Sequence, residues 1–221
     1  MESRRRLIIV DDHKLVAQGI AGCLAPHYEI AGIAHSGGEL LELLARDTPD
    51  CVLLDLTMPG RSGFDLLSDL CLMRPELKIL ILTMHLDRVL AEACINSGAR
   101  GYVPKECTED DLLLAISEVL AGRIHISPLI PRRTDRVSLK AAHPSLASLT
   151  PRQHEILHLI GRGESTALIA AALRISDKTV EFHRANLRQS LGIATEWGLT
   201  RYALLMKAAE AERRGAEADQ V

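Results

Sequence analysis

The chain has 221 residues, of which 47% are hydrophobic and only 3% are aromatic, so that any core must be largely aliphatic. This length suits two small domains better than one. No run approaches the roughly 20 apolar residues of a membrane span, and the N-terminus lacks a signal-peptide pattern. Five cysteines without C-x-x-C spacing fit reduced thiols better than disulfides or a zinc site. We therefore expect a cytoplasmic protein with no membrane segment.

Charge is divided unevenly along the chain. Residues 1–122 hold 11 Lys and Arg against 19 Asp and Glu, a net charge of −8, whereas residues 123–221 hold 15 against 10, a net charge of +5. The division suggests two modules with different partners, the second of which faces a polyanion such as nucleic acid. A chance variation of surface charge is the alternative interpretation, because +5 is modest.

Strand and helix patterns alternate through residue 121. Short aliphatic runs predict strands at 7–10, 28–34, 51–54, 78–82 and 101–103. A helical pattern follows each strand, and Ser36 and Thr108 each stand three residues before an acidic residue, as an N-terminal capping residue does. Five βα units connected by right-handed crossovers predict a parallel sheet with helices on both faces.

Polar residues stand at the carboxyl ends of four of these strands. The run Cys51–Leu54 is apolar without alternation and is followed by Asp55, while Asp11 and Asp12, Thr83 and Lys105 follow three other strands. In a doubly wound sheet these ends share one edge, so the side chains converge. Three close carboxylates repel one another unless a cation is present, and Mg²⁺ suits such oxygen ligands. The pattern indicates a phosphate-accepting aspartate with a metal ion and two groups, Thr83 and Lys105, that bind phosphoryl oxygens.

A metal-dependent phosphohydrolase is a further possibility. Enzymes of that kind usually carry a second aspartate two residues after the nucleophile as general acid and base. Here that residue is Thr57, which cannot exchange a proton in this way. We therefore expect a phosphate acceptor rather than an enzyme with turnover.

The second half of the chain is predicted to be helical. Residues 123–148 lack periodicity and are expected to form a basic linker containing Arg132, Arg133 and Arg136. From residue 149, a short helix that Ser165 begins, a turn at Ile175-Ser176 and a longer helix up to Leu191 describe a helix-turn-helix. One such unit reads few bases, so that a homodimer on paired half-sites of double-stranded DNA is expected.

The first half closely resembles the receiver domain of bacterial response regulators. The residues that carry this resemblance are Val10-Asp-Asp-His13, the run from Pro49 to Gly60 with Gly63, Leu82-Thr83 and Gly101-Tyr-Val-Pro-Lys105. The resemblance implies a flavodoxin-like sheet in which Asp55 accepts a phosphoryl group from a sensor histidine kinase. It also implies that Mg²⁺ is held by Asp11, Asp12, Asp55 and the carbonyl of Thr57, that Thr83 and Lys105 contact the phosphoryl group, and that Tyr102 is an aromatic switch that turns inward.

The second half resembles the LuxR-type DNA-binding domain of NarL/FixJ regulators. The matching residues include Leu149-Thr-Pro-Arg152, Gly163, Ile175-Ser176, Thr179-Val180, His183 and Leu191-Gly192. Residues 1–122 are thus expected to form the receiver, 123–148 a linker and 149–221 a small all-α DNA-binding domain, which dimerises when the receiver is phosphorylated. The expected DNA contacts are Lys178, Thr179, Glu181, Arg184 and Arg188.

This second resemblance has departures. Thr166-Ala167-Leu168 replaces the usual Asn-Lys-Glu, and Glu181 and Ser190 stand where the family usually has lysine. A glutamate that faces phosphate costs affinity, whereas one that faces a cytosine amine could specify that base. The alternative is therefore a signalling protein whose helical domain binds a protein partner or has lost DNA binding.

Overall fold

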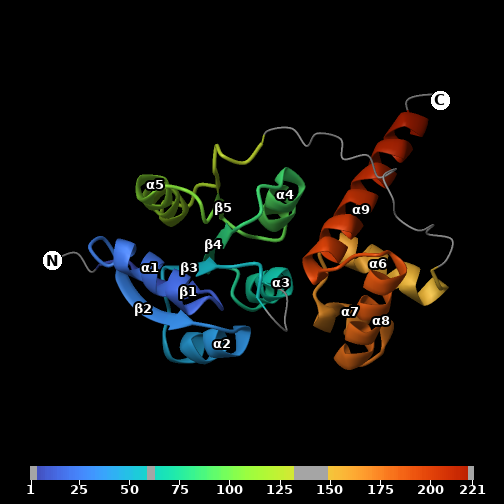
Figure 1. Cartoon of the computed structure of the whole chain (residues 1–221), viewed down its shortest axis with the longest axis horizontal. Helices are drawn as coiled ribbons and strands as arrows, with labels where there is room; N and C mark the ends of the chain where they lie inside the picture. Colours follow the sequence, from blue (N-terminus) through green and yellow to red (C-terminus); the bar gives the residue numbers. More distant parts are fainter. Residues whose placement is uncertain (1–3, 59–62, 132–148, 219–221) are drawn as a thin grey trace. The chain divides into compact units, whose positions relative to one another are not determined.

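The computed structural model describes residues 4–58, 63–131 and 149–218, with side chains up to residue 207. The chain divides into two compact units, Met1–Arg133 and Thr134–Val221 (Figure 1). Within the described ranges, every helix is too short or too polar to cross a lipid bilayer.

The first unit alternates strands with helices. Its elements are β1 (Arg6–Val10), α1 (Lys14–Leu24), β2 (Glu29–Ala34), α2 (Gly37–Arg46), β3 (Cys51–Leu54), α3 (Gly63–Met73), β4 (Lys78–Thr83), α4 (Arg88–Asn96), β5 (Gly101–Pro104), α5 (Glu109–Leu120) and β6 (His125–Ile126). All strand pairs are parallel and the order across the sheet is β2-β1-β3-β4-β5-β6. From β1 the chain adds β2 on one side of the sheet and then crosses back to add β3 on the other side of β1. The carboxyl ends of β1 and β3 are therefore neighbours at the point where the strand order reverses, which is where such folds place their ligands.

Both faces of the sheet are covered by helices. Alternate residues of the central strands, such as Leu7 and Leu53, pack with α1 and α5 in one aliphatic core. The residues between them, such as Ile8 and Val52, are equally buried, and α2, α3 and α4 lie on that side of the sheet (Figure 1). Burial on both faces explains why the strands are continuously apolar rather than alternating.

The sheet has six strands, one more than the sequence predicts. His125–Ile126 pair with Gly101 and Tyr102 of β5, although residues 123–148 were expected to be linker. A strand of two residues carries no periodicity, so it could not be recognised without its partner. Most of the expected linker, residues 132–148 with its three arginines, lies outside the described residues.

The second unit is helical, as predicted. It contains α6 (Pro151–Gly161), α7 (Thr166–Leu173), α8 (Asp177–Ser190) and α9 (Glu196–Ala218). Side chains of all four helices form one core that includes Ile156, Ile169, Leu187 and Tyr202. Thr150, Ser165 and Ser176 accept hydrogen bonds from backbone N–H groups at the starts of α6, α7 and α8, as N-terminal capping residues do.

Candidate functional site

The acidic site lies at the carboxyl ends of the strands because backbone pairing continues past them. The Asp11 N–H donates to Ala34 O over 3.0 Å, and the Asp55 N–H donates to Val10 O over 2.9 Å. The Lys105 N–H donates to Thr83 O over 2.8 Å. These bonds fix the register of the residues that follow β1, β3 and β5, so that their side chains meet above one edge of the sheet.

Lys105 joins two of the carboxylates. Its Nζ lies 2.9 Å from Asp55 Oδ2 and 2.6 Å from Asp11 Oδ2, and all three side chains are nearly inaccessible to solvent. The second Asp55 oxygen, Oδ1, accepts a hydrogen bond of 3.0 Å from the backbone N–H of Thr57. Asp55 is therefore held by a cation on one oxygen and a backbone donor on the other.

Burial and charge shift the pKa values of this pair. Burial raises the pKa of Asp55, and the neighbouring Asp11 raises it further, against the opposing effect of Lys105 and the Thr57 N–H. For Lys105, burial lowers the pKa, but the hydrogen bonds to Asp11 and Asp55 outweigh it, so that the pKa lies above the usual lysine value. The ammonium group thus remains charged beside the two carboxylates.

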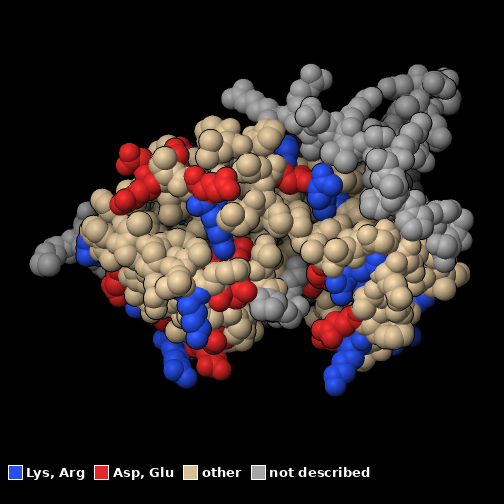
Figure 2. Space-filling model, viewed as in Figure 1, with Lys and Arg blue, Asp and Glu red and all other residues tan. Residues whose placement is uncertain are grey.

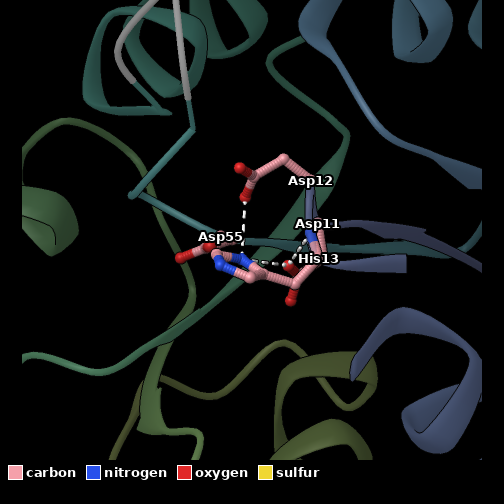
Figure 3. Close-up of side chains that lie close together, drawn as sticks. All are labelled: Asp11, Asp12, His13 and Asp55. Carbon is pink, nitrogen blue, oxygen red and sulfur yellow. Dashed lines mark hydrogen bonds and ion pairs between the residues drawn. The ribbon is translucent and has the colours of Figure 1, made fainter. Parts of the chain in front are cut away.

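Asp12 and His13 complete the acidic cluster. His13 Nδ1 lies 3.0 Å from Asp12 Oδ1 and 3.4 Å from Asp11 Oδ1, and the imidazole lies among the three carboxylates (Figure 3). One ligand atom from each of Asp11, Asp12, His13 and Asp55 lies within 4.8 Å of the others, a spacing that could hold a metal ion. Asp11 Oδ2 and Asp12 Oδ1 are buried, the first beside Lys105 Nζ and the second beside His13 Nδ1. Carboxylate oxygens of this kind are the ligands that a hard cation prefers.

The two predicted switch residues are both bonded to the backbone of His85. Thr83 is fully buried and its Oγ1 accepts a hydrogen bond of 3.3 Å from the His85 N–H. Tyr102 is also fully buried, and its hydroxyl donates to the His85 carbonyl over 2.8 Å. Tyr102 is thus already directed inward, and burial raises its pKa, which keeps the phenol protonated and able to donate.

Sequence reasoning gave no role to His13 or His85. Nε2 of His85 lies 3.3 Å from Thr57 Oγ1, so that the two residues that follow β3 and β4 touch beside Asp55. Burial lowers the pKa of His85, against the opposing charges of Asp55 and Asp87. The sequence did carry a signal for both: His13 lies two residues after Asp11, and His85 lies two residues after Thr83, so each follows a predicted site residue at a strand end.

The second candidate site is the helix-turn-helix. Helix α7 is followed by Arg174, whose φ of 54° places it in the left-handed region and turns the chain. Ser176 then begins α8, and its hydroxyl accepts from the Thr179 N–H over 3.1 Å. A short helix, a tight turn and a capped longer helix have the arrangement that the sequence predicts.

The predicted DNA contacts separate into three groups. Lys178 and Glu181 are exposed, and Thr179 is half-buried with its hydroxyl 2.8 Å from Ser176 Oγ. Arg188 is half-buried, with Nε 3.2 Å from Glu196 Oε2. Arg184 is only 4% exposed.

Arg184 does not have the exposure expected of a DNA contact. Its guanidinium pairs with Glu196 at the start of α9 and donates to Thr166 Oγ1 of α7 over 3.0 Å. Arg184 was predicted to be exposed from its helical spacing within α8. Spacing does not show which residues of other helices pack against it, so its burial could not be predicted. Thr166, a departure from the family pattern, is one of the partners that hold it inside.

The outward face of α8 differs from the predicted one. Every residue of α8 is described, and its exposed side chains are Asp177, Lys178, Glu181, Phe182, Ala185 and Gln189. Phe182 is 64% exposed. Sequence reasoning overlooked Phe182, Ala185 and Gln189, although they follow Lys178 at successive intervals of four, three and four residues, which is a helical spacing.

Comparison with known proteins assigns both units. Residues 7–117 match the response regulator receiver domain, and residues 147–203 match the bacterial regulatory proteins of the luxR family. The chain is 35% identical over 201 residues to the transcriptional regulatory protein MctR of Rhizobium johnstonii, covering 90% of this chain and 92% of that protein. The chain therefore belongs to the family of response regulators with a receiver and a LuxR-type DNA-binding domain, and it is a transcriptional response regulator.

Solved structures agree with this assignment. A LuxR-family response regulator from Aurantimonas is 36% identical, with a TM-score of 0.55, over 58% of this chain and 93% of that one. RcsB from Salmonella enterica serovar Typhimurium, bound to a promoter in the presence of the phosphomimetic BeF₃⁻, is 25% identical with a TM-score of 0.57, over 90% of this chain and 98% of that one. The predicted flavodoxin-like receiver followed by a helical domain is confirmed.

Proposed function

We propose that Asp55 accepts a phosphoryl group from a sensor histidine kinase in a Mg²⁺-dependent reaction, and that this controls dimerisation and DNA binding. The observation that carries the proposal is the convergence of Asp11, Asp55 and Lys105 within ion-pair distance. The acceptor is proposed to take part in single transfers rather than to turn over a substrate. A regulator of this kind works in the cytoplasm, where the bacterial chromosome lies.

Transfer needs an ionised, oriented nucleophile. One carboxylate oxygen of Asp55 forms the new P–O bond as the P–N bond of the phosphohistidine breaks. The Thr57 N–H and Lys105 Nζ hold the two oxygens of Asp55 in place, so that little reorientation is required during attack. Lys105 also provides a positive charge for the phosphoryl oxygens.

The metal site is proposed to include the carboxylates of Asp11, Asp12 and Asp55 and the carbonyl of Thr57. The buried oxygens Asp11 Oδ2 and Asp12 Oδ1 fit that role because hard cations prefer oxygen ligands. When bound, Mg²⁺ would neutralise charge on the transferring phosphoryl group. His13 Nδ1, which lies beside both Asp11 and Asp12, must then withdraw from them to give the cation room.

The switch is proposed to run through the backbone of His85. A phosphoryl group adds roughly −1.5 to −2 charges and three acceptor oxygens. If Thr83 moves toward the phosphoryl group to donate its hydroxyl to one of them, its oxygen moves away from the His85 N–H, and that hydrogen bond, already 3.3 Å long, is lost. Because the Tyr102 hydroxyl donates to the carbonyl of the same residue, the loop between β4 and α4 and the buried tyrosine respond together.

The output is proposed to be binding of double-stranded DNA by a homodimer on paired half-sites. The domain division proposed for this function is residues 1–122 as receiver, 123–148 as connection and 149–221 as DNA-binding domain. Lys178, Thr179, Glu181 and Arg188 remain proposed contacts, with Arg188 restricted by its ion pair with Glu196. Arg184 is excluded from the proposed set by its burial.

Phosphorylation can be tested with radiolabelled acetyl phosphate and the full chain. We expect label in the wild type and in Asp110→Asn, an exposed control on α5, and none in Asp55→Asn or after removal of Mg²⁺ with EDTA. Label in Asp55→Asn would contradict the assignment. Steady release of phosphate from a small substrate would favour a phosphohydrolase instead.

DNA binding can be tested by a gel shift against the gene's own upstream region, with and without acetyl phosphate. A shift that strengthens with the phosphodonor in the wild type, and not in Asp55→Asn, is expected. The second candidate function is a protein-binding output domain. It is favoured by Glu181 and Ser190, which stand where the family usually has lysines that contact phosphate.

A further inference from the structure

The outward face of α8 carries an apolar patch that the unit itself does not use. Phe182 is 64% exposed, and Ala185, three residues later, is exposed as well. Residues three apart on a helix are neighbours on its surface, so the two side chains form one patch. The His183 ring lies edge-on to the Phe182 ring, with centroids 5.9 Å apart, and leaves most of the phenylalanine accessible.

The patch is flanked by polar side chains on the same stripe. Lys178 precedes Phe182 by four residues, Gln189 follows Ala185 by four, and Glu181 is adjacent. The arginines that could have given the stripe a basic character are engaged elsewhere, Arg184 with Glu196 and Thr166 and Arg188 with Glu196. The exposed residues of α8 are therefore better suited to contacting base edges than to binding phosphates.

An apolar patch on such a helix has a specific counterpart in DNA. The second helix of a helix-turn-helix lies in the major groove with its N-terminal residues at the base edges. Phe182 is the sixth residue of α8 and lies one turn beyond Lys178. The C5 methyl group of thymine is the apolar group on the major-groove edge, and phenylalanine and alanine side chains can contact it.

We propose that Phe182 is a specificity-determining residue that reads the C5 methyl group of thymine, with Ala185 extending the contact. The inference rests on the proposed DNA binding and adds the base that α8 selects. A protein partner on the same patch is the competing occupant. It is disfavoured because Lys178, Glu181 and Gln189 surround the patch with donors and acceptors that match the edges of neighbouring base pairs.

The test uses the full chain with acetyl phosphate and Mg²⁺. A duplex is first selected from a random pool, and copies are then made in which deoxyuridine replaces one thymidine at a time, which removes only the methyl group. We expect the wild type to lose about fourfold in affinity at one or two positions per half-site, the factor that corresponds to one buried methylene-sized group. Phe182→Ala should bind the thymine duplex more weakly and should no longer distinguish it from the uracil copies.

Two further variants serve as controls. Leu72→Ala removes an apolar side chain of similar exposure, 61%, from the end of α3 and should leave the distinction intact. Lys178→Ala removes a neighbouring contact of the same stripe, so it should weaken binding but keep the distinction between thymine and uracil. Because Phe182 is exposed, its replacement should not alter the melting temperature, which is measured in parallel.

The results separate the two proposals. If the wild type binds every uracil copy as tightly as the thymine duplex, or if Phe182→Ala still distinguishes them, DNA binding stands and the role of Phe182 is overturned. The role of Phe182 in reading DNA is also overturned if Phe182→Ala keeps its DNA affinity but no longer self-associates in analytical ultracentrifugation. If no duplex is selected and no form of the chain binds DNA, the proposed function fails and this inference fails with it.

Discussion

A single residue, Lys105, determines the charge balance of the acidic site. Its Nζ is within 3 Å of both Asp11 and Asp55, and its side chain is 9% exposed. Without that cation, two buried carboxylates would face each other, and each would raise the pKa of the other. The lysine therefore allows Asp55 to be ionised and buried at once, which a nucleophile for phosphoryl transfer requires.

Asp50 provides a pH-dependent test of stability away from the site. Burial raises the pKa of Asp50, but the hydrogen bonds from the Arg6 N–H and the Arg5 guanidinium outweigh it, so that its pKa is below the usual value. A lowered folded-state pKa stabilises the fold above the unfolded-state pKa of about 3.9, and the contribution is lost as the pH falls through the folded-state pKa.

We expect Asp50→Asn to cost about 1 kcal/mol in the free energy of unfolding at pH 7. The difference from the wild type should narrow as the pH falls from about 5 to about 3. Urea unfolding at several pH values measures it. A difference that stays constant with pH would show that the carboxylate charge of Asp50 is not involved.

The packing of whole elements also constrains the site: the first residue of α3, Gly63, lies so close to the backbone of Asp55 that only glycine fits at this position. A Cβ at Gly63 would lie 2.4 Å from Asp55 O and 2.5 Å from Leu56 Cα, and both atoms belong to the backbone. We expect Gly63→Ala to cost about 1–3 kcal/mol, as overpacking does, and to slow labelling of Asp55 by displacing it.

Gly22→Ala is the matched control for that substitution. Gly22 lies within α1, and a Cβ there would meet no atom within 4 Å. Alanine should therefore stabilise the protein by up to about 1 kcal/mol and leave labelling unchanged. If the two substitutions had equal effects on labelling, the close approach of α3 to Asp55 would not matter for the chemistry.

Helices α7, α8 and α9 are joined by Arg184 and Glu196. Replacing Glu196 by alanine leaves the buried guanidinium of Arg184 without its carboxylate, which we expect to cost about 3 kcal/mol. Thermal unfolding of the second unit should shift down in Glu196→Ala and remain unchanged in Lys178→Ala, which is exposed. A DNA-binding defect in Lys178→Ala without any loss of stability would then distinguish a contact residue from one that holds the helices together.

Two compact units with separate cores characterise the molecule as a whole. We expect calorimetry to show two unfolding transitions. In the wild type, acetyl phosphate with Mg²⁺ should raise only the transition of the first unit, because ligands stabilise the unit that binds them. In Asp55→Asn it should raise neither transition. A single transition that moves as one would contradict independent folding of the units.

Net charge alone does not describe how the second half meets a polyanion. On the face shown in Figure 2, acidic and basic side chains are interspersed over both units and neither kind forms a continuous patch. Two of the arginines that contribute to the net charge of +5, Arg184 and Arg188, pair with Glu196. Phosphate contacts would have to come from other cations or from helix N-termini.

The sequence by itself determined the alternation of strands and helices, the caps at Ser36 and Thr108, and the positions of Asp11, Asp55 and Lys105 at strand ends. These features depend on local periodicity and on the rule that parallel strands end at one edge. Only the tertiary structure decided that His125–Ile126 pair with β5, that His85 joins Thr83 to Tyr102, and that Arg184 is buried while Phe182 is exposed. Each of these depends on a partner distant in the chain, because one turn of helix can face either way until its neighbours are in place.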